Sequence, residues 1–328
     1  FNAVEKANNL LSALIDNNLQ SKVNNLNIDP RTIVWKRVID MNDRALRNIT
    51  IGLGGTANGI PREDGFNITP ASEVMAILCM ATDFDNLKER LGNIFIGFNH
   101  DKQPVFARDL KAENAMAILL KHAIKPNLVQ TLEGNPAIIH GGPFANIAQG
   151  TNTIIATKMG LSLSNYVVTE AGFGADLGAE KFLNIKSQFA HLNPKCVVLV
   201  ATIRALRHHG GAKSEDYNTP SLEKVKDGFK NLEKHIENIR KFNIEPVVAV
   251  NAFTSDSEEE IDFVVKKCAN LGVTAVLSKG WEKGGEGTSE LAKAVVEVVE
   301  HKASNYKPLY DWKSPIKDKI EVIAKEIY

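Results

Sequence analysis

The sequence contains little cysteine and no cysteine pair. Only three of the 328 residues are cysteines, and Cys79, Cys196 and Cys268 lie far apart with no Cys-X-X-Cys spacing. This distribution excludes a disulfide framework and a zinc site, and each cysteine lies in an apolar run typical of a core. We therefore expect a reducing, cytoplasmic environment and no metal held by protein side chains.

Neither sign of charge is in excess. The 39 Lys and Arg residues balance 39 Asp and Glu residues, which gives a formal net charge of zero. Nucleic-acid-binding domains usually carry a basic excess, so the balance argues against that class. No apolar run approaches the length of about 20 residues that spans a bilayer. We therefore expect neither a nucleic acid nor a membrane as a partner.

Two phosphate-binding motifs are absent or broken. The Walker A pattern is missing and no Gly-Lys dipeptide occurs, so the chain alone cannot hold a triphosphate in the manner of a P-loop. Gly52–Ala57 matches a relaxed dinucleotide fingerprint, but Pro61 follows where a helix should run. An NAD-dependent oxidoreductase is therefore disfavoured, although tight NAD(P) binding would restore that hypothesis.

Short apolar runs alternate with longer amphipathic ones from about residue 71. Repeated strand–helix units of this kind fold into an α/β structure with a mostly parallel sheet flanked by helices. Strands are predicted over residues 94–98, 137–140, 166–169, 197–202, 247–250 and 273–277. Helices are predicted over 8–19, 33–47, 72–81, 110–123, 145–163, 222–242, 258–271 and 289–300, with a short one ending the chain.

Two local signals refine this organisation. Ser257 followed by Glu260 is a capping-box pattern, which predicts a helix start near residue 257. The stretch 209–220 is polar and rich in turn formers, as linkers are. We therefore expect a large α/β domain over residues 1–215 and a smaller one over 216–328.

Glycine-rich or polar loops follow five of the predicted strands. In an open α/β sheet, ligands bind at the carboxyl ends of the strands, where glycines let backbone approach and helix-start amides attract anions. As a set, the loops predict a nucleotide or phosphate site, while glycines that only close strand–helix turns are the alternative. They contain His140, Gly141 and Gly142, then Glu170 to Asp176, then Arg204, then Asn251, and last Lys279 to Gly287.

Four of these loop residues have side chains suited to catalysis or ligand binding. Glu170, Asp176 and Arg204 could serve a phosphate, a magnesium ion or a proton transfer. Salt bridges at strand ends are the alternative role for all three. His140 is the candidate for a hydrogen bond to a ligand.

Two aromatic residues lie in polar loops just after strands. Phe253 and Trp281 have Asn, Thr, Lys and Gly as neighbours, so no apolar core explains them locally. Flat side chains at neighbouring strand ends would clamp a planar heterocycle by stacking. The alternative is that each ring covers the edge of a core.

Several of these segments resemble signatures of the formate–tetrahydrofolate ligase (formyltetrahydrofolate synthetase) family, and the resemblance runs essentially from end to end. The family usually has Lys at the position of Arg207 and Pro at that of Thr254, so the sequence departs there. The matching blocks are 58–66, 125–131, 140–148, 169–181 and 200–211.

This resemblance implies an ATP-dependent ligase of one-carbon metabolism. Such an enzyme phosphorylates formate with Mg-ATP, and tetrahydrofolate then attacks formyl phosphate to give 10-formyltetrahydrofolate, ADP and phosphate. It implies a homotetramer, a monovalent cation such as K⁺ or NH₄⁺ as activator, and a P-loop-NTPase-like core. It also implies that the P-loop precedes Phe1 and that a further domain follows Tyr328. A catalytically inactive folate- or nucleotide-binding fragment is the alternative for the isolated chain.

The resemblance also suggests roles for individual residues. Matching motifs assign Trp281 and Phe253 to a pair that sandwiches the pterin, with Leu277 on the wall of the pocket. Phe173 and Gly172 match the loop beside formyl phosphate. Asn251 is assigned to adenine, because it ends a strand as the base-reading Asn does in related P-loop NTPases. The nucleotide roles of His140, Gly141 and Gly142 are inferred from their place at the end of a predicted strand and not from the resemblance.

Overall fold

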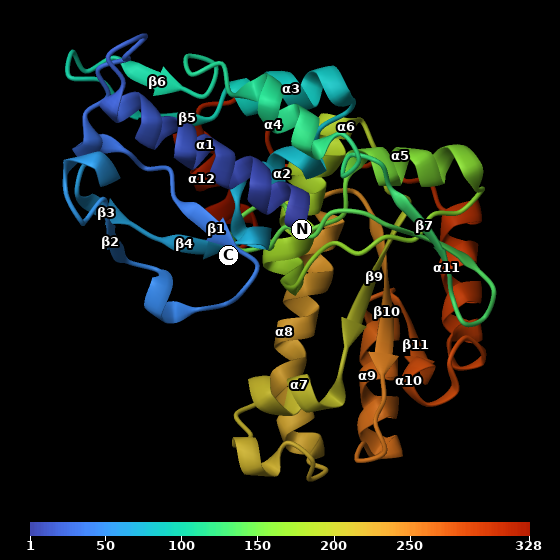
Figure 1. The fold of residues 1–328 in the computed structure, drawn as a ribbon. Coiled ribbons are helices and arrows are strands. Elements are labelled where there is room, and N and C mark those ends of the chain that lie inside the picture. The colour runs from blue at the N-terminus through green and yellow to red at the C-terminus, as the bar shows by residue number, and fades with distance from the viewer. The chain divides into compact units, whose positions relative to one another are not determined.

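Helices and short strands alternate along residues 1–328, all of which the computed structural model describes (Figure 1). They divide into unit 1, Phe1–Gly172, and unit 2, Phe173–Tyr328. The boundary predicted between residues 215 and 216 falls inside unit 2; as a division of functional domains it stays a prediction. No helix is long and apolar enough to cross a membrane.

The core of unit 1 is built on α1 (Asn2–Gln20). Its side chains Val4, Leu11 and Ile15 are fully buried and join one apolar cluster with residues of three further helices. Those helices are α2 (Glu73–Met80), α3 (Phe84–Gly92) and α4 (Glu113–Leu120). The fifth helix, α5 (Ile154–Leu163), is shorter than the predicted 145–163 and packs on α2 and on the strand β8 (Pro136–Ile139).

The strands of unit 1 form four separate pairs rather than one sheet. Only β1 (Arg37–Ile39) with β4 (Phe66–Ile68) is parallel. The antiparallel pairs are β2 (Ile49–Ile51) with β3 (Arg62–Asp64), β5 (Phe95–Phe98) with β6 (Pro104–Phe106), and β7 (Asn127–Gln130) with β8 (Pro136–Ile139).

Two predicted elements of unit 1 are wrong. Residues 33–47 contain β1 instead of a helix, because the side-chain amide of Asn9 on α1 donates to the Val38 carbonyl and accepts from its N–H. Residues 166–169 form no strand, and the side chain of Val168 is 91% exposed. The prediction of a single sheet carrying five site loops is therefore wrong.

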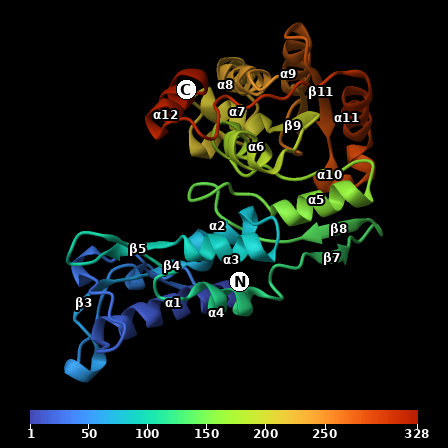
Figure 2. The same ribbon diagram turned by 90° about the horizontal axis from the view of Figure 1, so that it is seen from above.

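Three of the predicted strands form a parallel sheet in unit 2. Its strands are β9 (Cys196–Ala201), β10 (Glu245–Asn251) and β11 (Thr274–Ser278), in the order β11–β10–β9. The buried run Val247–Val250 forms the centre of the sheet. Both crossovers run in the same direction, so α8 (Leu222–Arg240) and α9 (Glu258–Asn270) pack on one face. The helix α11 (Ser289–His301) covers the other face, as Figure 2 shows beside β11.

The remaining elements of unit 2 are short. Two π-helical segments, η5 (Gly174–Ala179) and η6 (Phe182–Ser187), lead into α6 (Gln188–Ala190). The helices α7 (Ile203–His209) and α10 (Gly280–Lys283) follow β9 and β11, and α12 (Ile316–Glu326) is the last. The predicted capping box at Ser257 is confirmed, with both of its reciprocal hydrogen bonds formed.

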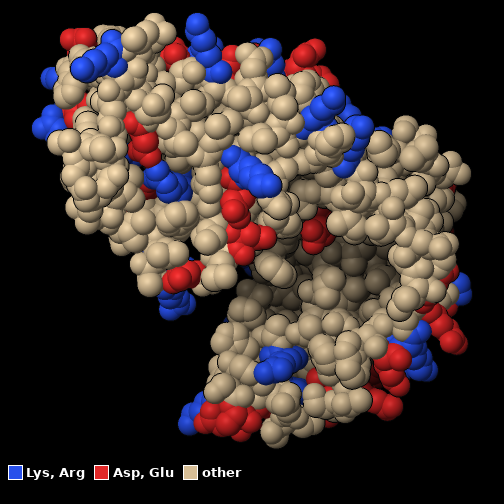
Figure 3. Space-filling view, viewed as in Figure 1, with Lys and Arg blue, Asp and Glu red and all other residues tan.

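The balance of charge is visible on the surface as well as in the composition. On the face shown in Figure 3, Lys and Arg side chains alternate with Asp and Glu side chains over each unit, with no large area of one sign.

The fold of the chain is mixed α/β, with short parallel sheets flanked by helices.

Candidate ligand site at the carboxyl edge of the unit 2 sheet

The three strands of unit 2 are parallel, so their carboxyl ends meet at one edge of the sheet, at its lower end in Figure 1. We call this the carboxyl edge. In the strand register Val250 pairs with Leu277 and Asn251 with Ser278, so β10 and β11 end side by side. Beyond the strands, the Ala252 N–H donates to the Ser278 carbonyl at 3.3 Å. The loops that carry the two predicted aromatic residues therefore leave the sheet together.

Phe253 and Trp281 meet at this edge. Their ring centroids lie 6.4 Å apart and their planes are tilted by 47°. The Trp281 side chain is 76% exposed and that of Phe253 is 39% exposed, so neither ring is buried in a core. We call them the aromatic pair. Exposed apolar rings have an unfavourable free energy of hydration, and these two do not recover it by burial in a core. Such an arrangement is typical of a surface that binds a flat ligand.

A hollow lies at the carboxyl end of β11, and neither ring of the aromatic pair lines it. Its volume is about 320 Å³, at the lower end of the range for small-molecule sites. Leu277 is half-buried and forms part of its apolar wall with Val276. The rest of the lining comes from Lys279, Lys283, Glu286, Gly287 and Glu290.

Arg204 and Asn251 also lie at the carboxyl edge. Arg204 is exposed on the first turn of α7, and its guanidinium carbon lies 5.5 Å from the centroid of the Tyr217 ring. Asn251 is the last residue of β10, two positions before Phe253. The edge therefore brings together five of the predicted site residues: Arg204, Asn251, Phe253, Leu277 and Trp281.

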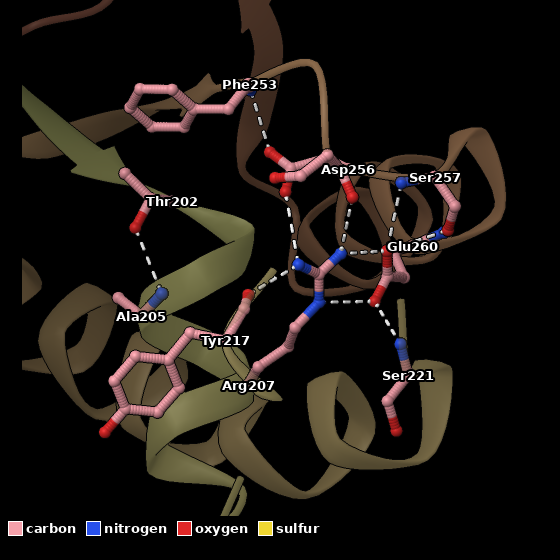
Figure 4. A network of polar contacts seen from close by, with 10 residues as sticks. Thr202, Ala205, Arg207, Tyr217, Ser221, Phe253, Asp256, Ser257 and Glu260 are labelled. Carbon is pink, nitrogen blue, oxygen red and sulfur yellow. Dashed lines mark hydrogen bonds and ion pairs between the residues drawn. The ribbon is translucent and has the colours of Figure 1, made fainter. Parts of the chain in front are cut away.

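A buried ion pair between Arg207 and Glu260 joins two helices next to this edge. Arg207 on α7 is completely buried, and its guanidinium binds Glu260 in a bidentate arrangement, with Nε to Oε1 at 2.8 Å and Nη2 to Oε2 at 2.6 Å (Figure 4). Burial would raise the pKa of Glu260, but hydrogen bonds from Arg207 and from the backbone of Ser221 and Ser257 outweigh it and lower the pKa to about 2. Glu260 therefore stays ionised within the folded protein.

A second carboxylate, Asp256, lies beside the same guanidinium. Its Oδ1 atom is 3.5 Å from Nη1 of Arg207, and its side chain is fully buried. Burial raises the pKa of Asp256 by more than the Phe253 N–H and the charge of Arg207 lower it. None of these three residues was predicted as a site residue from the sequence. The signals for them were the capping-box pattern at Ser257 and Glu260 and the position of Arg207 in the block 200–211.

Comparison with known proteins identifies the family. The profile of the formate–tetrahydrofolate ligase family matches residues 1–328. A curated formate–tetrahydrofolate ligase from Pelagibacter ubique (strain HTCC1062) is 58% identical over 328 residues, which is 100% of this chain and 58% of that protein.

The chain belongs to the formate–tetrahydrofolate ligase family. It spans somewhat more than half the length of the curated relative. The family resemblance of the sequence blocks is therefore confirmed over the whole chain.

Other predicted nucleotide-site residues of this family member lie in unit 1. His140 is buried; its Nε2 lies 2.7 Å from the Ala123 carbonyl and its Nδ1 2.7 Å from the Thr153 hydroxyl. A neutral ring that donates through Nε2 and accepts through Nδ1 satisfies both contacts, and burial lowers the pKa of His140 in agreement. Thr153 in turn caps α5 by accepting from the Ala156 N–H. Both nitrogens of His140 are thus engaged within unit 1.

The glycines beside His140 lie in tight packing. Gly141 has a φ of +76°, and a Cβ atom there would lie 2.5 Å from the Cys79 sulfur. Gly142 approaches the Phe1 ring in the same way, at 3.2 Å. After β9, a Cβ atom at Gly210 would lie 1.9 Å from the Lys224 carbonyl oxygen of α8. Close packing therefore accounts for Gly141 and Gly210, which favours the alternative interpretation of these glycines.

Four further predicted residues lie around the junction of the two units. Glu170 and Gly172 end unit 1, and Glu170 is exposed. Phe173 begins unit 2 and is 93% exposed. Asp176 lies in η5 beside His235, near the end of α8 that leads into the amino end of β10. Within unit 2, Asp176 and Arg204 therefore do not share one edge of the sheet.

A larger hollow in unit 2 is lined mainly by polar groups. Its volume is about 440 Å³, and it lies between α6 and residues 304–308, where no predicted site residue is found. The Ser304 hydroxyl donates to the Pro194 carbonyl at 2.7 Å, and the Tyr306 hydroxyl donates to the Leu183 carbonyl. These polar groups join two chain segments, so we assign the hollow to packing. No cluster of three or more His, Cys, Asp or Glu side chains that could hold a metal ion occurs.

Proposed function

We propose that the protein formylates tetrahydrofolate with formate and ATP, through formyl phosphate, and that the carboxyl edge of unit 2 binds the pterin. The products are 10-formyltetrahydrofolate, ADP and phosphate. The observation that carries the proposal is the aromatic pair, two exposed rings 6.4 Å apart at neighbouring strand ends of a chain in this family.

The separation of the rings suits a flat heterocycle with little adjustment. Stacked layers in contact are about 3.5 Å apart, so a ring held between two others needs centroids about 7 Å apart. The aromatic pair is within 1 Å of that spacing, and rotation of the exposed Trp281 side chain would remove the 47° tilt. Leu277 then offers an apolar wall beside the ligand.

The other roles in the proposal rest on the family and on position. Asn251, at the end of β10, is proposed to contact adenine, with His140, Gly141 and Gly142 as further nucleotide residues. Gly172 and Phe173 are proposed to lie at formyl phosphate, and Glu170, Asp176 and Arg204 to act in the chemistry. Mg-ATP as substrate, a monovalent cation as activator, a P-loop-NTPase-like core, a cytoplasmic homotetramer and the binding of formate are proposed for the whole protein.

A folate-binding chain without ligase activity is the second candidate function. The packing of Gly141 against Cys79 and of Gly210 against α8 favours it, because neither glycine offers open backbone to a phosphate. An assay of ATP-dependent formyl transfer by residues 1–328 separates the two candidates. Turnover would refute the second candidate, whereas tetrahydrofolate binding without turnover would support it.

A fluorescence titration tests the pterin site itself. Tetrahydrofolate stacked on Trp281 should quench its emission in a saturable manner, and Trp281→Phe should lose that component. Trp312→Phe is the matched control, because Trp312 is also exposed but lies away from the carboxyl edge. Equal saturable quenching in wild type and Trp281→Phe would refute the proposed pterin site.

A further inference from the structure

Arg207 uses its buried guanidinium to join three loops. Besides Glu260, it donates to the Tyr217 carbonyl through Nη1 at 2.8 Å (Figure 4) and to the Ser255 carbonyl through Nη2 at 3.3 Å. Asp256 Oδ1 lies 3.5 Å from Nη1, which is an ion-pair contact without a hydrogen bond. The position of the 252–257 loop, which follows β10, is thereby tied to α7.

Asp256 connects this buried centre to the aromatic pair. Its Oδ2 atom accepts a hydrogen bond from the Phe253 backbone N–H at 2.8 Å, and its own N–H donates to the Phe253 carbonyl at 3.0 Å. The two bonds close a four-residue turn that fixes the Phe253 backbone at both ends. The other carboxylate oxygen of Asp256 faces Arg207, so a single side chain lies between the buried cation and the exposed ring.

Glu260 has a different part in the network. It accepts from Ser221 and Ser257 as well as from Arg207, which fixes the start of α9 and the end of the 210–221 loop. These bonds would hold the fold of unit 2 without any contact to Phe253. The Asp256 bond to the Phe253 N–H adds nothing to the helix cap. Its effect falls on the conformation of the ring-bearing loop.

We propose that Asp256, held by Arg207, is a positioning residue that fixes Phe253 at the spacing needed for a pterin. The inference rests on the proposed function and names a residue for that same site. A loop that is ordered before binding loses no conformational entropy when the ligand binds, so the affinity of the site for the ligand is higher.

The experiment compares variants of residues 1–328 that differ in the acceptor at position 256. Asp256→Ala and Asp256→Leu remove the acceptor, and Leu also fills the buried volume if the Ala variant fails to fold. Asp256→Asn keeps an oxygen for the Phe253 N–H, and the neutral side chain is tolerable because the Tyr217 carbonyl still satisfies Nη1 of Arg207. Asp262→Ala is the matched control, since Asp262 is exposed on α9 and pairs only with Lys266.

Two readouts are taken on each variant. Amide hydrogen exchange of Phe253 without ligand should rise at least tenfold in Asp256→Ala and Asp256→Leu, and stay within about threefold of wild type in Asp256→Asn and Asp262→Ala. The dissociation constant for tetrahydrofolate should rise about tenfold in the first two variants only.

The outcomes separate the inference from the proposed function. Unchanged exchange of the Phe253 amide in both acceptor-free variants would overturn the positioning role, as would faster exchange with unchanged affinity. Faster exchange spread evenly over unit 2 would also overturn it, because that pattern indicates a general loss of stability. If wild type fails to bind tetrahydrofolate, the proposed pterin site is refuted, while the exchange data still decide whether Asp256 fixes the loop.

Discussion

The substitution Glu260→Gln should destabilise unit 2 by about 3 kcal/mol. Glu260 accepts two hydrogen bonds from Arg207 and others from the Ser221 N–H, the Ser257 N–H and the Ser257 hydroxyl. Gln removes the negative charge, and its NH2 group replaces one of the two oxygens that accept these hydrogen bonds. Two donor groups then face each other, and the buried charge of Arg207 is no longer compensated by Glu260. Breaking one partner of a buried ion pair costs about 3–5 kcal/mol.

The pKa of Glu260 reflects the same hydrogen bonds and gives a second route to the magnitude. A pKa of about 2 in place of the ordinary 4.5 corresponds to about 3 kcal/mol, at about 1.36 kcal/mol for each unit of pKa. The two routes agree on the order of magnitude. A loss of this size is a large part of the stability of a typical domain, about 5–15 kcal/mol.

The assay is urea unfolding at pH 7 followed by tryptophan fluorescence in a Trp35→Phe background. The remaining tryptophans, Trp281 and Trp312, both belong to unit 2, so the signal reports that unit alone. Glu259→Gln is the matched control, because Glu259 is the exposed neighbour on the same helix turn and its loss should cost under about 1 kcal/mol. Equal losses in the two variants would refute the reasoning.

Three further results are expected. Unit 2 should lose stability as the pH falls from about 4.5 towards 2, because Glu260 is protonated over this range. Asp256 acts in the opposite direction, because its pKa is raised in the folded protein. The urea midpoint should therefore change less with pH in Glu260→Gln than in the wild type. Gly228→Ala should cost about 2 kcal/mol in the same assay although Ala favours helix, because its Cβ would lie 1.9 Å from the Leu206 carbonyl oxygen; a gain in stability would contradict this contact. His140→Ala should destabilise unit 1 by about 3 kcal/mol, as followed by the fluorescence of Trp35 with Trp281 and Trp312 replaced by Phe. An unchanged midpoint would show that the two buried contacts of His140 contribute nothing.

Long periodic segments were predictable from the sequence because their own pattern decides the structure. The helices over 222–240 and 258–270 follow amphipathic runs, and the second begins at its capping box. Residues 33–47 also look helical, but the bonds from Asn9 to Val38 are long-range and leave no local signal. The β7–β8 hairpin was missed for a similar reason, since the run 137–140 alone does not say whether its partner is parallel.

The candidate site was predictable where strand order decides it. Phe253 and Trp281 follow consecutive strands, and consecutive strands of an α/β sheet are usually neighbours, so the rings were expected to meet. His140 and Glu170 were placed at the same edge only by assuming one continuous sheet, which the structure does not contain. Asp256 could not be found from composition, because its role depends on a buried Arg207 that is 49 positions earlier in the printed sequence.

Intermolecular nuclear Overhauser effects between tetrahydrofolate and residues 1–328 would show directly whether the aromatic pair holds the pterin. We expect cross-peaks from the methylene protons of the reduced pterin ring to the ring protons of both Phe253 and Trp281. In folded Asp256→Ala the same cross-peaks should be weaker at a tetrahydrofolate concentration that does not saturate the variant. Cross-peaks to neither ring, with tetrahydrofolate bound, would place the ligand elsewhere and contradict the site described for this member of the formate–tetrahydrofolate ligase family.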